Sequence, residues 1–169
     1  MKETSGAVYD YDDKYRYRLW RRWNAALPSA CMILHNPPSI DVSNDPTITR
    51  CAALAEKWGY GGIEIVNLFA YRATKPHELW QAEDPIGPHN DEHIKRALIH
   101  SKICVVAWGD IPAGRRERSA MVLRLVENKP LYCLGITKLR QPRHPLYPLR
   151  FSAETPEVPL EPFHPTIKR

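Results

Sequence analysis

The sequence has no run of about 18 or more apolar residues, so no segment of it is long and apolar enough to cross a bilayer as a helix. The first residues, MKETSGAVYDYDDKY, contain no apolar core of the kind that a secretory signal requires. We therefore expect a cytoplasmic protein without a membrane partner. At 169 residues, the chain has the length of one domain.

Metal-binding patterns are also missing. The cysteines at positions 31, 51, 104 and 133 lie far apart among apolar neighbours, and none has a second cysteine or a histidine at zinc-site spacing. The seven histidines show no His-Glu-x-x-His pattern. We expect reduced thiols in the core, no metal and no other cofactor.

Basic residues, in contrast, are concentrated. Residues 112–150 hold nine basic and two acidic residues, a net charge of +7 in a chain whose total is +5, so the remainder is slightly acidic. A second cluster, YRYRLWRRW at 15–23, interleaves arginine with aromatic residues. Arginine beside stackable rings suits phosphate backbones and unpaired bases, although a solvated strand with one basic face would show the same alternation. Together the two clusters indicate a nucleic-acid partner.

Four short apolar runs predict the core of the fold, at residues 30–35, 62–69, 103–109 and 130–135. They are apolar on both faces, which is typical of strands inside a parallel sheet. Helical stretches lie between them, at 46–59, 90–101 and 113–129. Strands that alternate with helices predict an α/β protein, a three-layer α/β/α sandwich around a central, mostly parallel four-stranded sheet.

The ends of the helices carry their own signals. Pro46 follows Asp45 at the expected start of the first helix, and Gly59 follows its last turn. Asn90 is the expected cap of the second helix. In the third, we expect one apolar face formed by Met121, Val122, Leu125 and Val126.

Residues outside the central sheet have weaker patterns. The alternation in residues 15–20 predicts an extra edge strand. We expect one domain over residues 1–150, followed by a proline-rich tail at 151–169 that is extended or disordered, and a monomeric protein.

Because ligands of such sheets bind beyond the carboxyl ends of the strands, the residues that follow each strand locate the site. Asn36, Asn67 and His144 follow three of the predicted strands, and we expect them to converge on one crevice. A buried asparagine is more often a turn or cap residue than a ligand contact, but three such groups together favour a binding site.

Four motifs now point to a family: NPPS (36–39), IVNLFAYRATKP (65–76), VVAWG (105–109) and PRHPLYPLR (142–150). Together with DPTITRC (45–51) and DPIGPHND (84–91), they resemble the DUF1643 proteins over nearly the whole chain. The same four positions are more remotely similar to the uracil-DNA glycosylase superfamily. That resemblance implies a DNA glycosylase that breaks the N-glycosidic bond of a flipped nucleotide and leaves an abasic site.

The resemblance also implies roles for residues. His144 would donate to O2 of the base, where charge develops in the transition state. Asn36 would orient the attacking water, with Asp41 or Asp45 as open alternatives, and Asn67 would read the Watson–Crick edge of a pyrimidine. Phosphates would be held by five basic residues: Arg115, Arg116, Lys138, Arg143 and Arg150.

One departure from the glycosylases concerns the substrate. Uracil-specific members carry a tyrosine ring that blocks C5 of the base, whereas here Pro38 and Ser39 stand in the corresponding run. The C5 side of the pocket is therefore expected to be open. Polar side chains at Ser39, Asp41, Ser43 and Asn44 would suit a bulky, even sugar-bearing, C5 substituent. Such bases occur in hypermodified bacteriophage DNA, which implies a role in phage defence.

Three other interpretations stay open: an N-glycosidase for free nucleotides, a module that binds a modified base without cleaving it, and a scaffold in which the motifs serve only the fold. The segment DPIGPHND has no counterpart in the glycosylases. We interpret it as a structured loop leading into a helix; alternatively, His89, Asn90 and Asp91 would cover the pocket.

Overall fold

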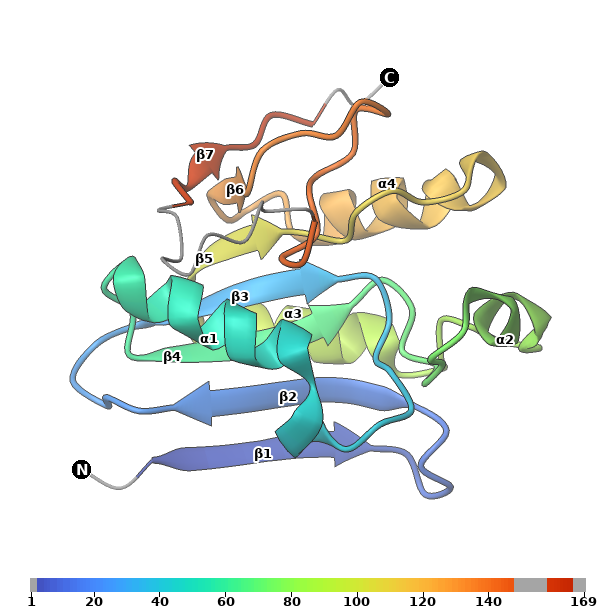
Figure 1. Ribbon diagram of the computed structural model, residues 1–169, viewed down its shortest axis with the longest axis horizontal. Coiled ribbons are helices and arrows are strands. Elements are labelled where there is room, and N and C mark those ends of the chain that lie inside the picture. Colours follow the sequence, from blue (N-terminus) through green and yellow to red (C-terminus); the bar gives the residue numbers. More distant parts are fainter. Residues whose placement is uncertain (1–2, 148–157, 166–169) are drawn as a thin grey trace.

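The computed structural model describes residues 3–147 and 158–165, and within them the strands form one sheet in the order β1-β2-β4-β3-β5-β6-β7 (Figure 1). The strands are β1 Thr4–Tyr9, β2 Arg16–Arg22, β3 Ser29–Leu34, β4 Gly62–Asn67, β5 Ser101–Val106, β6 Leu131–Cys133 and β7 Glu161–Pro162. The mixed α/β class predicted from the sequence is confirmed.

The middle of the sheet is parallel. Strand β3 pairs in parallel with β4 on one side and with β5 on the other, and β5 pairs in parallel with β6. These are the four apolar runs identified in the sequence. The expectation of a four-stranded sheet is nevertheless wrong, because β1, β2 and β7 extend it antiparallel to seven strands among the described residues. The strand predicted at residues 15–20 is present as β2, but it is not the edge strand, because β1 pairs outside it. An apolar run reveals only strands that are buried on both faces, and β1 and β7 are partly exposed.

Helices cover both faces of the sheet. Figure 1 shows α1 (Pro46–Lys57) in front of the sheet and α3 (Asn90–Ile99) behind it, with α4 (Arg116–Leu125) beside β5 and β6. The short helices α2 (Pro76–Gln81), η1 (Val42–Asn44) and η2 (Ala113–Arg115) lie in the connecting segments. No helix among the described residues is long and apolar enough to cross a membrane.

The residues of β3 alternate between two apolar layers. Cys31 and Ile33 pack in the layer beneath α3 and α4, and Ala30 and Met32 pack in the layer beneath α1. The other thiols follow the same division: Cys104 and Cys133 lie in the first layer, and Cys51 in the second. All four cysteines are free and buried, as expected for core thiols.

The predicted start of α1 is confirmed. The side chain of Asp45 accepts a hydrogen bond of 2.9 Å from the amide of Thr47, Pro46 is the first helical residue, and Gly59 follows the helix with φ +83°. In α3 the prediction was wrong by one position, because His89 is the cap and Asn90 is the first helical residue. The side chain of Asn90 is turned inward and makes other contacts, described below.

The expected apolar face of α4 is partly wrong. Val122 and Val126 are buried, but Met121 is 43% exposed, and Arg118 and Ser119 are buried in its place. A buried arginine at this position is tolerated because its guanidinium has partners: Nε donates to the carbonyl of Leu68, and Nη2 lies 2.6 Å from Asp91. The helix is therefore rotated from the orientation that hydropathy alone predicts.

Candidate active site

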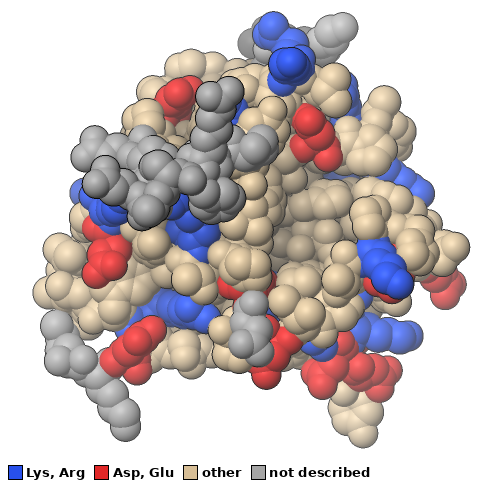
Figure 2. Space-filling model, viewed as in Figure 1, with Lys and Arg blue, Asp and Glu red and all other residues tan. Residues whose placement is uncertain are grey.

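The candidate site lies beyond the carboxyl ends of the parallel strands. The chain leaves β3 toward β4 on one side and leaves β5 toward β6 on the other, so the two connections diverge between β3 and β5. Such a divergence is where open α/β sheets bind their ligands. Figure 2 shows the surface hollowed at this place, past the end of β3 and next to the segment that follows β6.

His144 is fixed against the extension of β5. Gly109 has φ +75°, and a β-carbon built there would lie 3.2 Å from Cβ of His144. The amide of Gly109 donates a hydrogen bond of 2.9 Å to the carbonyl of Pro142. A side chain at residue 109 would therefore require His144 to shift by a few tenths of an ångström, and glycine lets the loop after β6 rest closely on the end of β5.

The imidazole of His144 is held neutral. Burial and, to a smaller extent, the neighbouring His35 lower its pKa to about 4, against a smaller opposite effect of Asp45. Its Nδ1 accepts a hydrogen bond of 3.2 Å from the amide of Leu146. Because Nδ1 is the acceptor, the proton of the neutral ring lies on Nε2. Near neutral pH, His144 is thus an uncharged ring with one N–H donor.

His35, which sequence reasoning missed, is a second imidazole at this edge. It follows β3 directly and packs edge-on against the rings of Phe69 and Trp80, with centroids 5.5 and 5.7 Å away. Burial lowers its pKa, and a contact with the side chain of Asn36 opposes the shift. Among the described residues its Nε2 is buried without a hydrogen-bond partner. The signal in the sequence was its place at a strand end beside Asn36.

Asn36 joins two loops. Its Nδ2 donates to the carbonyl of Pro37 at 3.1 Å and to the carbonyl of Ala73 at 2.9 Å. The amide nitrogen therefore ties the loop after β3 to the loop after β4. Only Oδ1 of this side chain remains to orient a water.

Asn67 ends β4 and is 2% exposed, and its Oδ1 has no partner within the described part of the chain. The backbone around Asn67 is held by hydrogen bonds from the side chains of Asn90 and Arg118. Nδ2 of Asn90 donates to the carbonyls of Asn67 and Leu68, at 3.0 and 3.1 Å, and Nε of Arg118 donates to that of Leu68 at 2.8 Å. The DPIGPHND segment thus leads into α3 and supports this strand end.

The two acidic candidates are engaged in capping. Asp41 is exposed, and the pKa of its carboxyl is lowered because Oδ1 accepts from the amide and the hydroxyl of Ser43. It lines a groove over β1 and β2 together with Arg21 and Arg72. Asp45 is buried, caps α1 and lies 3.9 Å from Arg16.

The C5-side candidates lie on the loop after β3. Pro38 is half-buried and Ser39 is exposed. The amide of Ser39 donates to Thr74 at 3.1 Å, which attaches this loop to the one after β4. The side chain of Asn44 lies outside the described residues.

The basic candidates come from two segments. Arg115 is exposed with its guanidinium 5.1 Å from the ring centroid of Trp80, and Arg116 donates to the carbonyl of Ile111. In the loop after β6, Lys138 is exposed and Arg143 contacts the ring of Tyr147. Arg150 lies outside the described residues.

Fold and site together define an α/β protein with a polar edge of the sheet that holds two neutral imidazoles and two asparagines. The family comparison matches residues 16–146 to the family described as "Protein of unknown function (DUF1643)". The chain belongs to this family, as the motifs indicated. The matched region contains every strand of the parallel core and both histidines of the site, His35 and His144. No curated protein and no solved structure gave a match. Within the described residues, no group of three or more histidine, cysteine or acidic side chains could hold a metal ion.

Proposed function

We propose that this protein is a DNA glycosylase that hydrolyses the N-glycosidic bond of a modified pyrimidine and leaves an abasic site. The observation that carries the proposal is the state of His144, a neutral ring with its only N–H on Nε2, at the carboxyl edge of a parallel sheet. The resemblance to the uracil-DNA glycosylase superfamily supports it. In this proposal the quartet β4-β3-β5-β6 corresponds to the four-stranded sheet of those enzymes, and the protein acts on DNA as a cytoplasmic monomer.

In the proposed reaction, the bond between C1′ and the base breaks, and its electron pair leaves with the base. The sugar becomes oxocarbenium-like, and negative charge develops on O2 of the pyrimidine. Nε2–H of His144 donates to that oxygen, and this contact strengthens in the transition state. A water adds to C1′ and loses a proton. Among the described residues at this edge, the buried Nε2 of His35 is without a hydrogen-bond partner and can accept that proton.

In this proposal the base is recognised by Asn67 at the end of β4. The buried amide of Asn67 offers Oδ1, which is without a partner among the described residues, to the Watson–Crick edge of a pyrimidine. The rings of Phe69 and Trp80, 5.2 Å apart, provide an apolar wall beside His35. On the other side, Pro38 and Ser39 place no aromatic ring against C5. We therefore propose a base with a bulky C5 substituent, such as a glucosylated hydroxymethylcytosine of phage DNA, and a role in phage defence.

One observation favours a second candidate, a module that binds the modified base without cleaving it. Asp41 and Asp45 are both engaged in capping hydrogen bonds, and the amide nitrogen of Asn36 is bound to two backbone carbonyls. A site whose acidic groups are engaged in this way has less means to activate water. The two candidates share the pocket and differ only in whether product forms.

The experiment that tests the proposal is alkali-induced strand cleavage on matched oligonucleotides. They carry uracil, thymine, 5-hydroxymethylcytosine, its glucosylated form or plain cytosine, and each is treated with wild type and with His144→Ala. Abasic sites at a modified base, lost in the variant, are the expected result. Binding without cleavage on every substrate would replace the enzyme by the binding module. Neither binding nor cleavage would move the search to free nucleotides.

A further inference from the structure

A second cavity, of about 470 Å³, lies between α4, the loop after β6 and the segment around β7. Trp108 contributes to its lining, and the next residue, Gly109, contacts His144. The cavity and the candidate active site are therefore adjacent along the end of β5. None of the roles proposed above uses this cavity.

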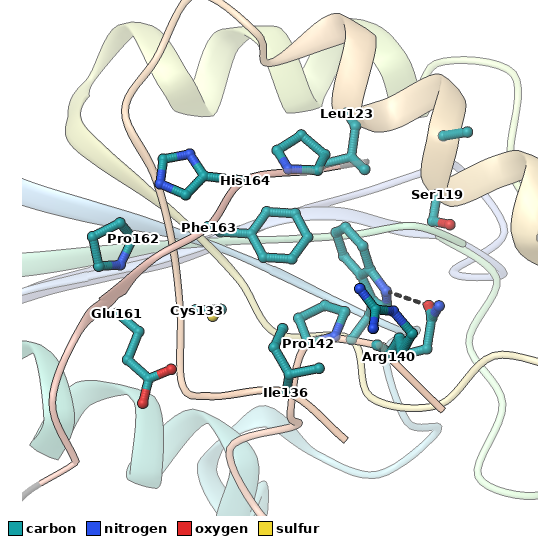
Figure 3. Close-up of a pocket in the computed structure, with 14 residues that line it drawn as sticks. Ser119, Leu123, Cys133, Ile136, Arg140, Pro142, Glu161, Pro162, Phe163 and His164 are labelled. Carbon is teal, nitrogen blue, oxygen red and sulfur yellow. Dashed lines mark hydrogen bonds between the residues drawn. The ribbon is translucent and has the colours of Figure 1, made fainter. Parts of the chain in front are cut away.

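Its walls combine flat apolar surface with charge. Figure 3 shows the ring of Phe163 in the middle of the cavity, with Leu123 on one side of the ring and Ile136 and Pro142 on the other. The indole of Trp108 is 3% exposed and is oriented by a hydrogen bond of 3.3 Å from Nε1 to Oε1 of Gln141, drawn as the dashed line. A planar ring that enters the cavity would meet an aromatic surface.

Arg140 provides the positive charge. Its φ is +59°, a conformation that residues with a β-carbon rarely adopt. The turn is imposed by Thr137, whose carbonyl accepts from the amide of Arg140 at 3.0 Å, and whose hydroxyl donates to Asp110 at 2.6 Å. Within the described part of the chain, no acidic side chain pairs with the guanidinium of Arg140. The fold thus holds the guanidinium of Arg140 at the cavity, without an acidic partner among the described residues, in a costly backbone conformation, as functional sites often do.

The charges are separated across the cavity. In Figure 3, Arg140 lies on one side of the Phe163 ring, and Glu161 lies on the other side with His164. A phosphate would be attracted to the first side and repelled by the carboxylate on the second. The arrangement therefore gives a bound nucleotide one orientation, with its phosphate at Arg140 and its base over Phe163.

We propose that this cavity binds a second, unpaired nucleotide of the same DNA strand whose target base enters the site at His144. The proposal rests on the proposed function for the identity of that strand. Base–aromatic stacking and an arginine–phosphate pair are the two contacts by which single strands are held without sequence reading. A base that is paired in a duplex cannot stack on Phe163. The substrate is therefore DNA that is single-stranded or locally opened over more than one nucleotide.

The test measures binding of an unmodified single-stranded oligonucleotide by fluorescence anisotropy, with no requirement for cleavage. Phe163→Leu keeps apolar bulk and removes the ring, and we expect about tenfold weaker binding. Arg140→Gln is expected to lower the slope of log K against log salt by about 0.7, as for one lost phosphate contact on a single strand. Arg124→Gln is the matched control and should bind like wild type, because it removes the same charge from an exposed position of α4 outside the cavity. Thermal unfolding of each variant identifies any loss of fold.

The same oligonucleotide annealed to its complement provides the second arm. The difference between wild type and Phe163→Leu should disappear on the duplex. Equal losses on both forms, variants that behave like Arg124→Gln, or no binding by wild type would each overturn the cavity proposal. Failure of the glycosylase proposal looks different, because binding would still depend on Phe163 while no abasic site forms. Abasic product with unchanged binding by Phe163→Leu would overturn the cavity alone.

Discussion

Gly109 packs directly against His144, whose Cβ lies close to the point where a side chain at residue 109 would begin. A β-carbon there would lie 3.2 Å from Cβ of His144, and φ of Gly109 is +75°. The position of the catalytic candidate thus depends on a residue just beyond the end of β5, 35 positions earlier in the chain. The cost of the backbone conformation can be separated from the effect of the contact, because Gly59 also has a positive φ but makes no such contact.

Gly109→Ala should impair both stability and His144-dependent activity. The left-handed backbone costs about 1 kcal/mol with alanine, and the new methyl group must displace His144. Gly59→Ala is the matched control, since Gly59 has φ +83° and nothing within 4 Å of its would-be β-carbon. Urea unfolding should show a loss of stability for both variants, the larger one for Gly109→Ala, whereas only Gly109→Ala should lose abasic-site formation. Equal activity in the two variants would contradict the seating of His144 on Gly109.

Acid should destabilise the protein through His144. Its pKa of about 4 in the folded protein lies below the ordinary value of 6.5, so the unfolded chain binds a proton that the folded one excludes. The stability due to the neutral ring is complete above pH 6.5 and is lost as the pH falls toward 4. Between pH 7 and pH 5, as measured by urea unfolding, His144→Gln should lose less free energy of unfolding than wild type.

The control for that measurement is His77→Gln, at an exposed position, which should follow the wild-type pH dependence. If the free energy of unfolding of His144→Gln changed with pH in parallel with that of wild type, the His144 ring would titrate as it does in water. That result would contradict the role of His144 as a neutral donor.

Asn36→Asp should destabilise the fold, although it is nearly isosteric. Nδ2 donates to two backbone carbonyls, and a carboxylate would face both oxygens without a proton to give. Loss of such a donor costs about 1–3 kcal/mol. Asn24→Asp is the control, because Asn24 uses its acceptor oxygen, toward the amide of Ala26, and aspartate retains it. Chemical unfolding of the pair compares the two directly, and equal stability would refute the bridging role of Asn36.

Arg115→Gln should weaken DNA binding in proportion to a single phosphate contact. Arg115 is exposed above Trp80 at the candidate site, and its loss should reduce the slope of log K against log salt by about 0.7 on a single strand. Lys102→Gln removes the same charge near the amino end of β5, away from the site, and should leave the slope unchanged. A salt titration of binding distinguishes them, and identical slopes would place the DNA elsewhere.

The central strands could be predicted because each is apolar on both faces, and that pattern is visible in one sequence. Strand β1 could not, since its burial comes from its pairing with β2. Gly6 leaves room for the ring of Trp20, its register partner, and nothing local in the sequence indicates that contact. Strand β7 has only two residues and forms against β6, far earlier in the chain.

The edge of the sheet at which the candidate residues lie could be predicted, because residues after parallel strands share an edge whatever their side chains do. The hydrogen bonds of those side chains could not be predicted. Asn90 was expected to cap a helix but fixes the end of β4, and Arg118, which was not part of the predicted apolar face, is buried. Both roles depend on carbonyls of a strand that is more than 20 residues away in sequence, at Asn67 and Leu68.

The burial of the four cysteines makes their chemical modification a measure of how each face of the sheet opens. Burial raises the pKa of Cys51, and the contact with the neighbouring Cys104, together with burial, raises the pKa of Cys31, so neither thiol reacts while the fold is closed. Cys51 belongs to α1 and packs in the layer between that helix and the sheet, whereas Cys31, on β3, packs in the layer beneath α3 and α4. The rate at which a thiol reagent modifies each one therefore reports the opening free energy of one layer, and unequal rates would show that the two layers open independently.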